Sequence, residues 1–465
     1  MKGYYTGFQL RLKIFLRRTQ LKDIKTDLQD SNLPIIVPRP EHRISRSQIS
    51  PHALKVLYRL KQSGHQAYLV GGGVRDLLLG QEPKDFDIAT DATPEQVRGV
   101  FRNCRLIGRR FRLAHVFFGA DIVEVATFRG RPELNPSGDH HTENGMIVRD
   151  NVYGTIAEDA LRRDFTINAL YYNIDDFSLV DYTGGLTDIA AKQLRLIGDD
   201  PVARYREDPV RMLRAVRFAA KLGFEIEDRC ERPLYDFGSL LDEVSPARLF
   251  EEVLKLFHSG CAVAAFEKLR HYGLFATLFP HTEHCLQQGA DTIALKLIER
   301  ALDNTDQRIR NNKPIVPFFL FSVLLWAPVY QRYQALLADK VSSHDAMIQA
   351  SSELIRLQSC QIVVPKRHVL LMREVWDLQP HLERRRGRRP LALIAHPRFR
   401  AAYDFLLLRA EAGEIDSYLA VWWTQFQQGN TAKRVAMMDI IKGYRTRKKR
   451  YRRPKKNKKV KEDSE

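Results

Sequence analysis

The sequence predicts an α+β protein, with a small mixed-sheet head domain followed by an all-α region of many helices. Two observations support this fold class. Between residues 46 and 190, short apolar runs of strand length alternate with brief helical patterns and with turns rich in glycine and aspartate. Beyond residue 190, apolar residues recur at helical spacing and strand patterns become rare. We therefore expect a head over residues 46–190, a helical neck over 191–265 and a helical body over 266–441.

The charge of the chain is strongly positive and is concentrated near its C-terminal end. The 465 residues carry a formal net charge of +18, which favours a polyanionic partner. Residues 442–465 hold thirteen lysines and arginines against three acidic residues and have too little apolar surface to fold. We expect this stretch to be a disordered basic tail that contacts RNA. Residues 1–45 are expected to form a flexible basic arm, and whether that arm touches a membrane stays open.

The composition also excludes several classes of protein. Five scattered cysteines without a C-x-x-C pair indicate neither a disulfide framework nor a zinc ribbon. The longest apolar stretch, residues 315–327, contains Pro317 and is shorter than the ~20 residues that cross a membrane. The N-terminus has no continuous apolar segment of the kind found in secretory signals. We therefore expect no transmembrane segment and a cytoplasmic location.

A strand, a glycine turn and a short helix form the first candidate site. Residues 68–70 are an apolar run, followed by Gly71, Gly72 and Gly73 and by a helical pattern that ends at Gly80. A strand that enters a helix through glycines presents backbone N–H groups and the positive end of a helix dipole, which suits phosphate. Glycine is expected here because a side chain would hold the phosphate away from the backbone.

Two aspartates follow this helix at a spacing of two residues. If Asp85 and Asp87 lie in one strand, their side chains point to the same side, while Phe86 and Ile88 face a core. Carboxylates roughly 6–7 Å apart at the backbone can converge on two divalent metal ions about 3.5–4 Å apart. A phosphate-binding turn beside such a pair is typical of a site for nucleotidyl transfer.

Thr93 and Gln96 are expected to cap a helix. Three further strands are expected after it, over residues 104–107, 114–118 and 121–128. The basic turn between the first two contains Arg109 and Arg110. These arginines contact an RNA backbone or a triphosphate, or they belong to a solvated hairpin, and the residues alone do not choose between the two.

Glu124 lies within an apolar strand pattern, where a carboxylate is costly unless it is paired or bound to metal. It is a candidate for a third metal-binding carboxylate, and equally for a salt bridge to a neighbouring arginine. Residues 130–149 are rich in Gly, Pro, Asn and charged residues, so we expect a mobile loop.

Two later segments place arginine beside carboxylate. A capping box at Thr155 opens a helix that runs into Arg162-Arg163-Asp164, where arginines that an aspartate orients could hold a triphosphate. The alternative is a local salt-bridge cluster. Asp208 and Arg211 lie three residues apart at the start of another helix, so they present an acceptor and a donor to a nucleobase or form an ion pair at the helix end.

A basic stretch interrupts the helical pattern near the C-terminal end. Residues 384–389 contain five arginines, and His396-Pro397-Arg398-Phe399-Arg400 follows. Basic residues interleaved with aromatic residues suit single-stranded RNA.

Five segments of the chain resemble one family. GGGVRDLLLG, KDFDIAT, RRDFTINAL and the EDPVRMLR helix start resemble the motifs of the bacterial poly(A) polymerases and CCA-adding enzymes, a branch of the polymerase-β-like nucleotidyltransferases. LIGRRFRLAHV is similar to the segment that separates the poly(A) polymerases from their CCA-adding relatives. The resemblance covers residues 45–440 and is strongest between 68 and 220.

This resemblance implies a nucleotidyltransferase head and template-independent addition of AMP from ATP to RNA 3′ ends by a two-metal mechanism. Two Mg²⁺ ions, or Mn²⁺, would be bound at Asp85 and Asp87, with Glu124 or Asp164 as the third carboxylate. The implied catalytic residues are Asp85, Asp87 and Asp164. The implied nucleotide-binding residues are Gly72, Gly73, Arg75, Arg163, Asp208 and Arg211, with Asp208 and Arg211 favouring adenine. The expected RNA-binding residues are Arg109, Arg110, Arg385, Arg386, Arg388, Arg447, Lys448 and Arg450.

The partners expected on this basis are ATP, the 3′ ends of mRNA and other transcripts, and proteins of RNA decay or RNA chaperoning. Two alternatives are kept. A CCA-adding enzyme that acts on tRNA would share these catalytic residues. A non-catalytic RNA-binding protein on the same scaffold would have no reason to keep two desolvated carboxylates.

Overall fold

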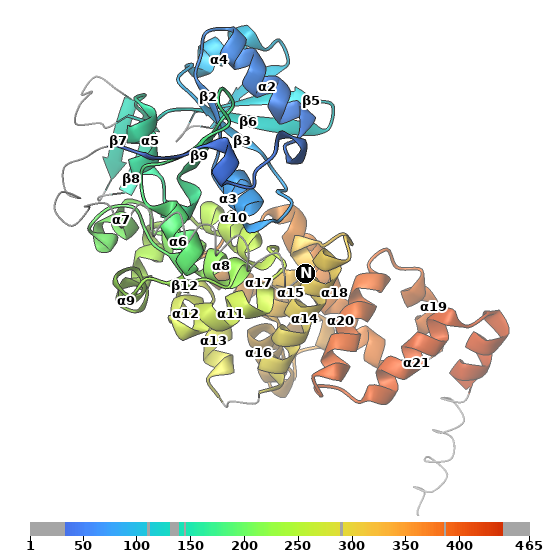
Figure 1. The fold of residues 1–465 in the computed structure, drawn as a ribbon. Helices are drawn as coiled ribbons and strands as arrows, with labels where there is room; N and C mark the ends of the chain where they lie inside the picture. Colours follow the sequence, from blue (N-terminus) through green and yellow to red (C-terminus); the bar gives the residue numbers. More distant parts are fainter. Residues whose placement is uncertain are drawn as a thin grey trace, which may run out of the picture. The chain divides into compact units, whose positions relative to one another are not determined.

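The computed structural model describes residues 33–108, 112–130, 139–143, 146–288, 292–385 and 387–439, without the side chains of residues 139–150. The chain divides into two compact units, Met1–Val244 and Ser245–Glu465 (Figure 1). The division falls within the stretch predicted as a neck, so residues 191–244 belong to the same unit as the head. Each unit is described separately below.

The first unit is built on one mixed sheet of eight strands in the order β1-β10-β9-β2-β3-β6-β5-β4. These strands are Ile35–Val37 (β1), Ala67–Val70 (β2), Asp87–Thr90 (β3), Cys104–Ile107 (β4), Leu113–Phe118 (β5), Asp121–Thr127 (β6), Leu170–Asn173 (β9) and Leu179–Asp181 (β10). All neighbouring strands are antiparallel except β3 and β6, where Ile88 pairs with Val125 in a parallel register. The mixed sheet that the sequence predicts is confirmed.

Helices begin where the capping residues of the sequence place them. Ser50 caps α2 (Pro51–Gln62), and capping boxes open α4 (Pro94–Val100) and α5 (Ile156–Arg162). Helices α2 and α4 contact each other and pack on strands β3 and β6 (Figure 1). Helix α3 (Gly72–Leu79) follows β2 and ends at Gly80, whose φ of 74° is the left-handed conformation of a helix C-terminus.

Two segments of the first unit differ from the prediction. Residues 35–37, expected in a flexible arm, form the edge strand β1 against β10, and Ile44 is fully buried. Within the loop predicted over residues 130–149, β7 (Asp139–Glu143) and β8 (Met146–Asn151) form a hairpin. The dipeptide Asn144-Gly145 in the sequence between them is the common signal of a hairpin turn, and it outweighs the polar composition.

The rest of the first unit is helical and carries two very short strands. Helices α6 (Gly185–Ala191), α7 (Pro201–Glu207), α8 (Val210–Leu222) and α9 (Asp228–Asp236) accompany the pair β11 (Gln193–Leu194) and β12 (Glu225–Ile226). Phe218 of α8 packs edge-on against Phe165, with ring centroids 5.6 Å apart. This contact fixes α8 next to the segment that follows α5.

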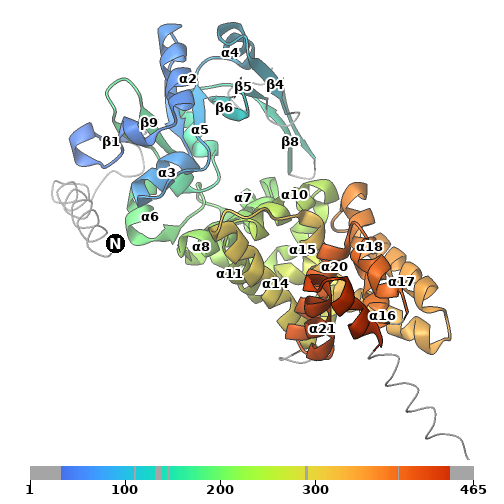
Figure 2. The same ribbon diagram turned by 90° about the vertical axis from the view of Figure 1, so that its right-hand side faces the viewer.

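The described residues of the second unit are helical. The helices are α10 (Pro246–Phe257), α11 (Ala262–His271), α12 (Leu274–Leu278), α13 (Pro280–Leu286), α14 (Ile293–Arg310), α15 (Pro317–Leu324), α16 (Trp326–Ala338), α17 (Ser343–Gln358), α18 (Lys366–Glu383), α19 (Arg389–Ile394), α20 (Phe399–Glu411) and α21 (Ser417–Gln428) (Figure 2). No helix within the described ranges is long and apolar enough to cross a membrane.

Three buried tryptophans organise the core of this helical unit. The indole N–H groups of Trp376 and Trp423 donate to the carbonyls of Ser322 and Leu382, at 3.0 and 2.9 Å. Trp326 donates to the Glu414 carboxylate at 2.9 Å. Each large ring is therefore buried without an unpaired N–H, which is the condition for tryptophan to stabilise a core.

Gly185→Ala tests the close contact at the start of α6. A Cβ at this position would overlap the carbonyl group of Thr166, so we expect the free energy of unfolding to fall by about 2 kcal/mol or more. Gly99→Ala is the matched control, because α4 leaves open space around Gly99, and it should be neutral or raise the stability by about 0.5–1 kcal/mol. Urea unfolding measures both, and equal stability of the two variants would contradict the contact.

Candidate active site

The glycine turn connects β2 to α3 through a backbone conformation that favours glycine. Gly71 has a φ of 77°, which L-residues with a side chain rarely adopt. A Cβ at Gly73 would lie 3.3 Å from the carbonyl oxygen of Asp85, so the absent side chain also lets the aspartate segment approach α3. The turn therefore brings the start of α3 and the two aspartates together.

The two aspartates do not share one strand. Strand β3 begins at Asp87, and Asp85 is an exposed residue in the segment before it. The prediction that both lie in the strand is therefore wrong for Asp85. Their charges still interact, because the carboxylate of Asp85 helps to raise the pKa of Asp87.

Negative charge is concentrated around Asp87. Burial raises the pKa of Asp87, the neighbouring carboxylates of Glu124 and Asp85 raise it further, and Arg163 opposes them, with a result of about 6. The ligand atoms of Asp85, Asp87 and Glu124 do not all lie within 4.8 Å of one another. Among the described residues, one group of three potential metal ligands meets that condition, and it is in the second unit. Carboxylate oxygens that repel one another are the donors that Mg²⁺ and Mn²⁺ prefer, so these residues fit a divalent metal site.

Glu124 lies on the open face of β6, with 49% of its side chain exposed. The apolar pattern around it predicts a buried carboxylate, and the structure corrects that prediction. Its partner is a histidine rather than an arginine: His115 stands opposite on β5, and its Nε2 lies 3.2 Å from the Glu124 carboxylate. Alternation along a strand explains this, since Val123 and Val125 face the core while Glu124 faces outward.

Arg163 points toward the glycine turn and is oriented by Asp159. A Cβ placed at Gly71 would lie 3.8 Å from Arg163 Nη1 and 3.9 Å from Asp87 Oδ2. Its Nη2 lies 2.9 Å from Asp159 Oδ2, and its Nε donates to Tyr171 Oη at 2.9 Å. Although burial lowers the pKa of Arg163, the charge of Asp159 raises it above its usual value. Asp159 is not among the residues predicted from the sequence, although its i,i+4 spacing to Arg163 indicates such a pair.

Asp159 is a buried carboxylate that contacts two arginines and a tyrosine hydroxyl. It is 1% exposed, it accepts a hydrogen bond from Tyr171 Oη at 2.6 Å, and Arg129 Nε lies 3.4 Å away. Burial would raise its pKa, but Arg163 and Arg129 lower it to about 2. This carboxylate therefore stays ionised and holds both arginines in place.

These groups line one cavity of about 210 Å³ beside the sheet. Asp87, Glu124 and Asp159 line it together with Arg163, Arg129 and Arg112. A cavity lined by both carboxylates and guanidinium groups can hold an anionic phosphate chain together with cations.

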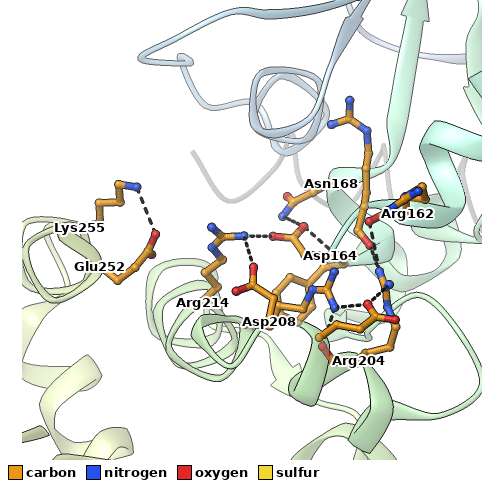
Figure 3. Close-up of polar contacts among 12 residues, drawn as sticks. Arg162, Asp164, Asn168, Arg204, Asp208, Arg214, Glu252 and Lys255 are labelled. Carbon is orange, nitrogen blue, oxygen red and sulfur yellow. Dashed lines mark hydrogen bonds and ion pairs between the residues drawn. The ribbon is translucent and has the colours of Figure 1, made fainter. Parts of the chain in front are cut away.

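Asp164 belongs to a second cluster, centred on Arg214 of α8 (Figure 3). Arg214 Nη1 lies 3.6 Å from Asp164 Oδ2 and 4.0 Å from Asp208 Oδ2. Asn168 Nδ2 donates to Asp164 at 3.3 Å. Burial would raise the pKa of Asp164, but Arg214 and the backbone N–H of Phe165 lower it. Asp164 and Asp208 thus form one group around Arg214. Asp85, Asp87 and Glu124 form a separate group.

Arg204 attaches α7 to the arginine segment that follows α5. Its Nη2 donates to the carbonyls of Arg162 and Arg163 at 3.2 and 2.6 Å (Figure 3). Glu207 accepts from both Arg204 and Arg211, at 2.6 and 2.8 Å. Burial and the charge of Arg211 lower the pKa of Arg204 to about 10. Helix α7, which ends just before Asp208, and the start of α8 at Arg211 are therefore held against the segment that carries Arg163.

The other predicted nucleotide ligands are buried in networks of their own. Asp208 and Arg211 are 5% and 6% exposed. Arg75, at 3%, pairs with Asp76 at 2.7 Å and donates to Asn168 Oδ1 at 2.5 Å. Its guanidinium lies over the ring of Phe218. Arg75 is thus held by Asp76, Asn168 and Phe218 within α3 and next to the glycine turn, and its role as a nucleotide ligand stays a prediction.

The expected RNA-binding residues fall mostly outside the described ranges, namely Arg109, Arg110, Arg386, Arg447, Lys448 and Arg450. Two of them are described, and both are in the second unit. The guanidinium of Arg385 lies 5.3 Å from the ring centroids of both Tyr418 and Trp422, and Arg388 is exposed. Tyr418 is 58% exposed, so its ring and the arginine together present a flat surface.

Three family models match the chain. A poly A polymerase head domain matches residues 67–195, a probable RNA and SrmB-binding site of polymerase A matches 223–286, and a polymerase A arginine-rich C-terminus matches 339–457. The chain is 48% identical to poly(A) polymerase I of Escherichia coli O6:H1 over 428 residues, covering 90% of this chain and 92% of that protein. It is 44% identical to poly(A) polymerase I of Haemophilus influenzae, covering 94% and 97%.

The CCA-adding enzymes are more distant. One from Bacillus pumilus is 35% identical over 53% of this chain and 60% of its own length. Among solved structures, the CCA-adding enzyme of Bacillus stearothermophilus in complex with CTP has a TM-score of 0.51 at 25% identity, covering 82% of this chain and 83% of its own. A tRNA nucleotidyltransferase bound to a primer tRNA and an ATP analogue has a TM-score of 0.53 at 23% identity, covering 80% and 98%, and shows a likeness of fold.

Asp159→Asn tests the buried carboxylate that orients Arg163. The ionised form is favoured in the folded state, where the pKa is about 2 against an ordinary 3.8. The stabilisation is therefore fully present above about pH 4 and is lost as the pH falls toward 2. We expect the variant to lack this acid-dependent component of about 2 kcal/mol, and to be about 3 kcal/mol less stable at pH 7 because two arginines lose their buried partner.

The measurement is urea unfolding between pH 2.5 and 7. Asp175→Asn is the control, because the Asp175 side chain is 56% exposed and pairs with Lys61 at the surface, so its effect should stay within about 0.5 kcal/mol. If the stability of wild type and Asp159→Asn had the same pH dependence, Asp159 would not be the ionised centre described here.

Proposed function

The chain belongs to the poly(A) polymerase family of nucleotidyltransferases, and from this premise we propose that it adds AMP from ATP to RNA 3′ ends without a template. The observation that carries the proposal is the cavity in which Asp87 and Glu124 face Arg163 beside the glycine turn. Likeness over nine-tenths of the chain to relatives named poly(A) polymerase I favours this function over addition of CCA to tRNA.

Divalent metal ions, two Mg²⁺ or Mn²⁺, would be held by Asp87 with Asp85 and Glu124, and when bound they would activate the RNA 3′-hydroxyl and neutralise the triphosphate. Side chains and backbone groups of the chain would bind the triphosphate itself. Arg163, held by Asp159 and Tyr171, lies at the glycine turn, where it would bind the triphosphate together with the backbone N–H groups of Gly72 and Gly73.

Selection of adenine is proposed for the helix α8 and its start. Asp208 is the candidate acceptor and Arg211 the candidate donor, and Arg214 connects Asp208 to Asp164. Because Arg211 already donates to Glu207 and to the carbonyl of Arg204, it would read a base edge only by sharing or exchanging these partners. Asp164 then acts by positioning this cluster rather than as a third metal-binding carboxylate.

RNA binding is proposed for the basic residues of the second unit and the tail. Arg385 stacked on Tyr418 offers a platform for an unpaired base, and the basic residues 442–465 would contact the RNA backbone. Contact with proteins of RNA decay or RNA chaperoning, and a cytoplasmic location, stay predictions.

Incorporation assays with a generic RNA and one nucleotide at a time test the function. The wild type should build long tails from ATP alone, and Asp87→Asn should lower the incorporation by about a hundredfold or more while RNA affinity stays unchanged. Asp175→Asn is the matched surface control. Use of CTP on tRNA in place of polyadenylation would support the CCA-adding alternative, and full activity of Asp87→Asn would support a site elsewhere.

Asp208→Asn tests the selection of adenine. The substitution replaces one of the two acceptor oxygens of the carboxylate by a donor NH₂ group and removes the charge that attracts Arg214. We expect the ratio of kcat/KM for ATP to that for CTP to fall by about tenfold or more, which corresponds to one good hydrogen bond to a charged group. Asp199→Asn, at an exposed position in the loop before α7, should leave the ratio unchanged. An equal ratio in both variants would remove Asp208 from base selection.

A further inference from the structure

Three metal-ligating side chains meet on two neighbouring helices of the second unit. His344 lies in the first turn of α17, and Asp377 and His381 lie in the C-terminal part of α18. The two helices pack against each other (Figure 2). Each residue offers a ligand atom within 4.8 Å of the ligand atoms of the other two, and within the described ranges no other three His, Cys, Asp or Glu residues do so.

The distances between these atoms suit a tetrahedral ion. His344 Nδ1 lies 3.0 Å from Asp377 Oδ1, and His381 Nε2 lies 3.9 Å from Asp377 Oδ2. Zinc–ligand bonds of about 2.0–2.1 Å place neighbouring ligands of a tetrahedron about 3.3 Å apart. The two contacts reach different oxygens of the Asp377 carboxylate, so this side chain would rotate to bring one oxygen to an ion together with both imidazoles. The exposed fractions of the side chains, between 34% and 59%, leave them room to close around an ion by small rotations.

The spacing of the two ligands on α18 is that of a chelating helix pair. Asp377 and His381 are four residues apart, so their side chains share one face of α18. His344 reaches the same point from α17. Because His381 lies in the last turn of its helix, the negative end of the helix dipole also favours a cation there.

The ligand chemistry distinguishes this site from the carboxylates of the first unit. Two imidazoles and one carboxylate suit Zn²⁺ and similar transition metals, whereas Mg²⁺ prefers oxygen ligands throughout. Three protein ligands with exposed side chains also leave a coordination position for water.

We propose that His344, Asp377 and His381 bind one divalent transition-metal ion, Zn²⁺ above all, and that this ion connects α17 to α18. The exposed His344–Asp377 contact by itself would contribute no more than about 1 kcal/mol, so it connects the two helices only weakly. An ion bound only by the folded state stabilises that state by mass action. The second unit therefore becomes more stable when zinc is present, independently of the transferase reaction.

The test is calorimetric titration of the full chain with Zn²⁺, in excess Mg²⁺ and without a polyhistidine tag. We expect one ion per chain and a Tm that rises with zinc. His344→Ala, Asp377→Asn and His381→Ala should each weaken binding by about tenfold or more and abolish the rise in Tm. His284→Ala, an exposed histidine of α13 outside the cluster, is the matched control, and Asp87→Asn should bind zinc normally because its carboxylate is in the other unit.

Substitution of Co²⁺ for Zn²⁺ gives an independent readout of the ligands. Nitrogen and oxygen ligands give visible d–d bands without the thiolate-to-cobalt charge-transfer band that a cysteine ligand would add. A spectrum lost in His381→Ala and kept in His284→Ala supports the site. Failure to bind zinc, binding that all three substitutions leave unchanged, or a thiolate band would each overturn it. Loss of adenylate incorporation with zinc binding intact would affect only the proposed function.

Discussion

The ionised carboxylate of Asp159 is the constraint on which the candidate active site depends. It is buried to 1% exposure and yet carries a charge, because Arg163, Arg129 and the hydroxyl of Tyr171 surround it. A buried charge of this kind is tolerated only when its partners are complete. Arg163 is consequently held in one orientation, with its Nη1 toward Gly71 and Asp87. A guanidinium that needs no reorganisation before a triphosphate arrives is preorganised for binding.

The carboxylates of Asp87 and Glu124, which also line the cavity, give it an excess of negative charge near Arg163. Asp87 has a pKa of about 6 because burial and the charges of Glu124 and Asp85 disfavour its ionised form. Such a cluster costs stability unless cations neutralise it. The parallel pairing of β3 and β6 creates it, since it sets Ile88 beside Val125 and so brings Asp87 and Glu124 onto neighbouring strands. The cavity therefore contains guanidinium groups that can bind phosphate and carboxylates that can bind cations, and a metal-bound nucleotide would use both.

Helices α7 and α8, which follow the sheet in the chain, contact the residues of the candidate active site directly. Arg204 binds the carbonyls of the segment that carries Arg163, and Arg214 pairs with Asp164. Through these contacts α7 and α8 belong to the same compact unit as the sheet. This explains why the boundary between the units falls at residue 244 and not at the change of composition near residue 190. The change of composition near residue 190 indicates a change from strands to helices. The boundary between compact units depends instead on which side chains are in contact.

Several helices and strands and the reactive groups were predictable from the sequence. Capping boxes at Thr93 and Thr155, the glycine turn and the strands around Asp87 and Glu124 follow local rules that act over a few residues, and they were predictable for that reason. The pairing of β7 with β8 was missed because the composition of these strands is polar. The pairing of Arg163 with Asp159 and of Arg75 with Asp76 joins residues close in the chain, so local spacing allows it. The contacts of Asp159 with Arg129 and Tyr171, and of Asp164 with Arg214, join residues far apart in the chain. These contacts depend on distances that the fold sets and that no local pattern encodes.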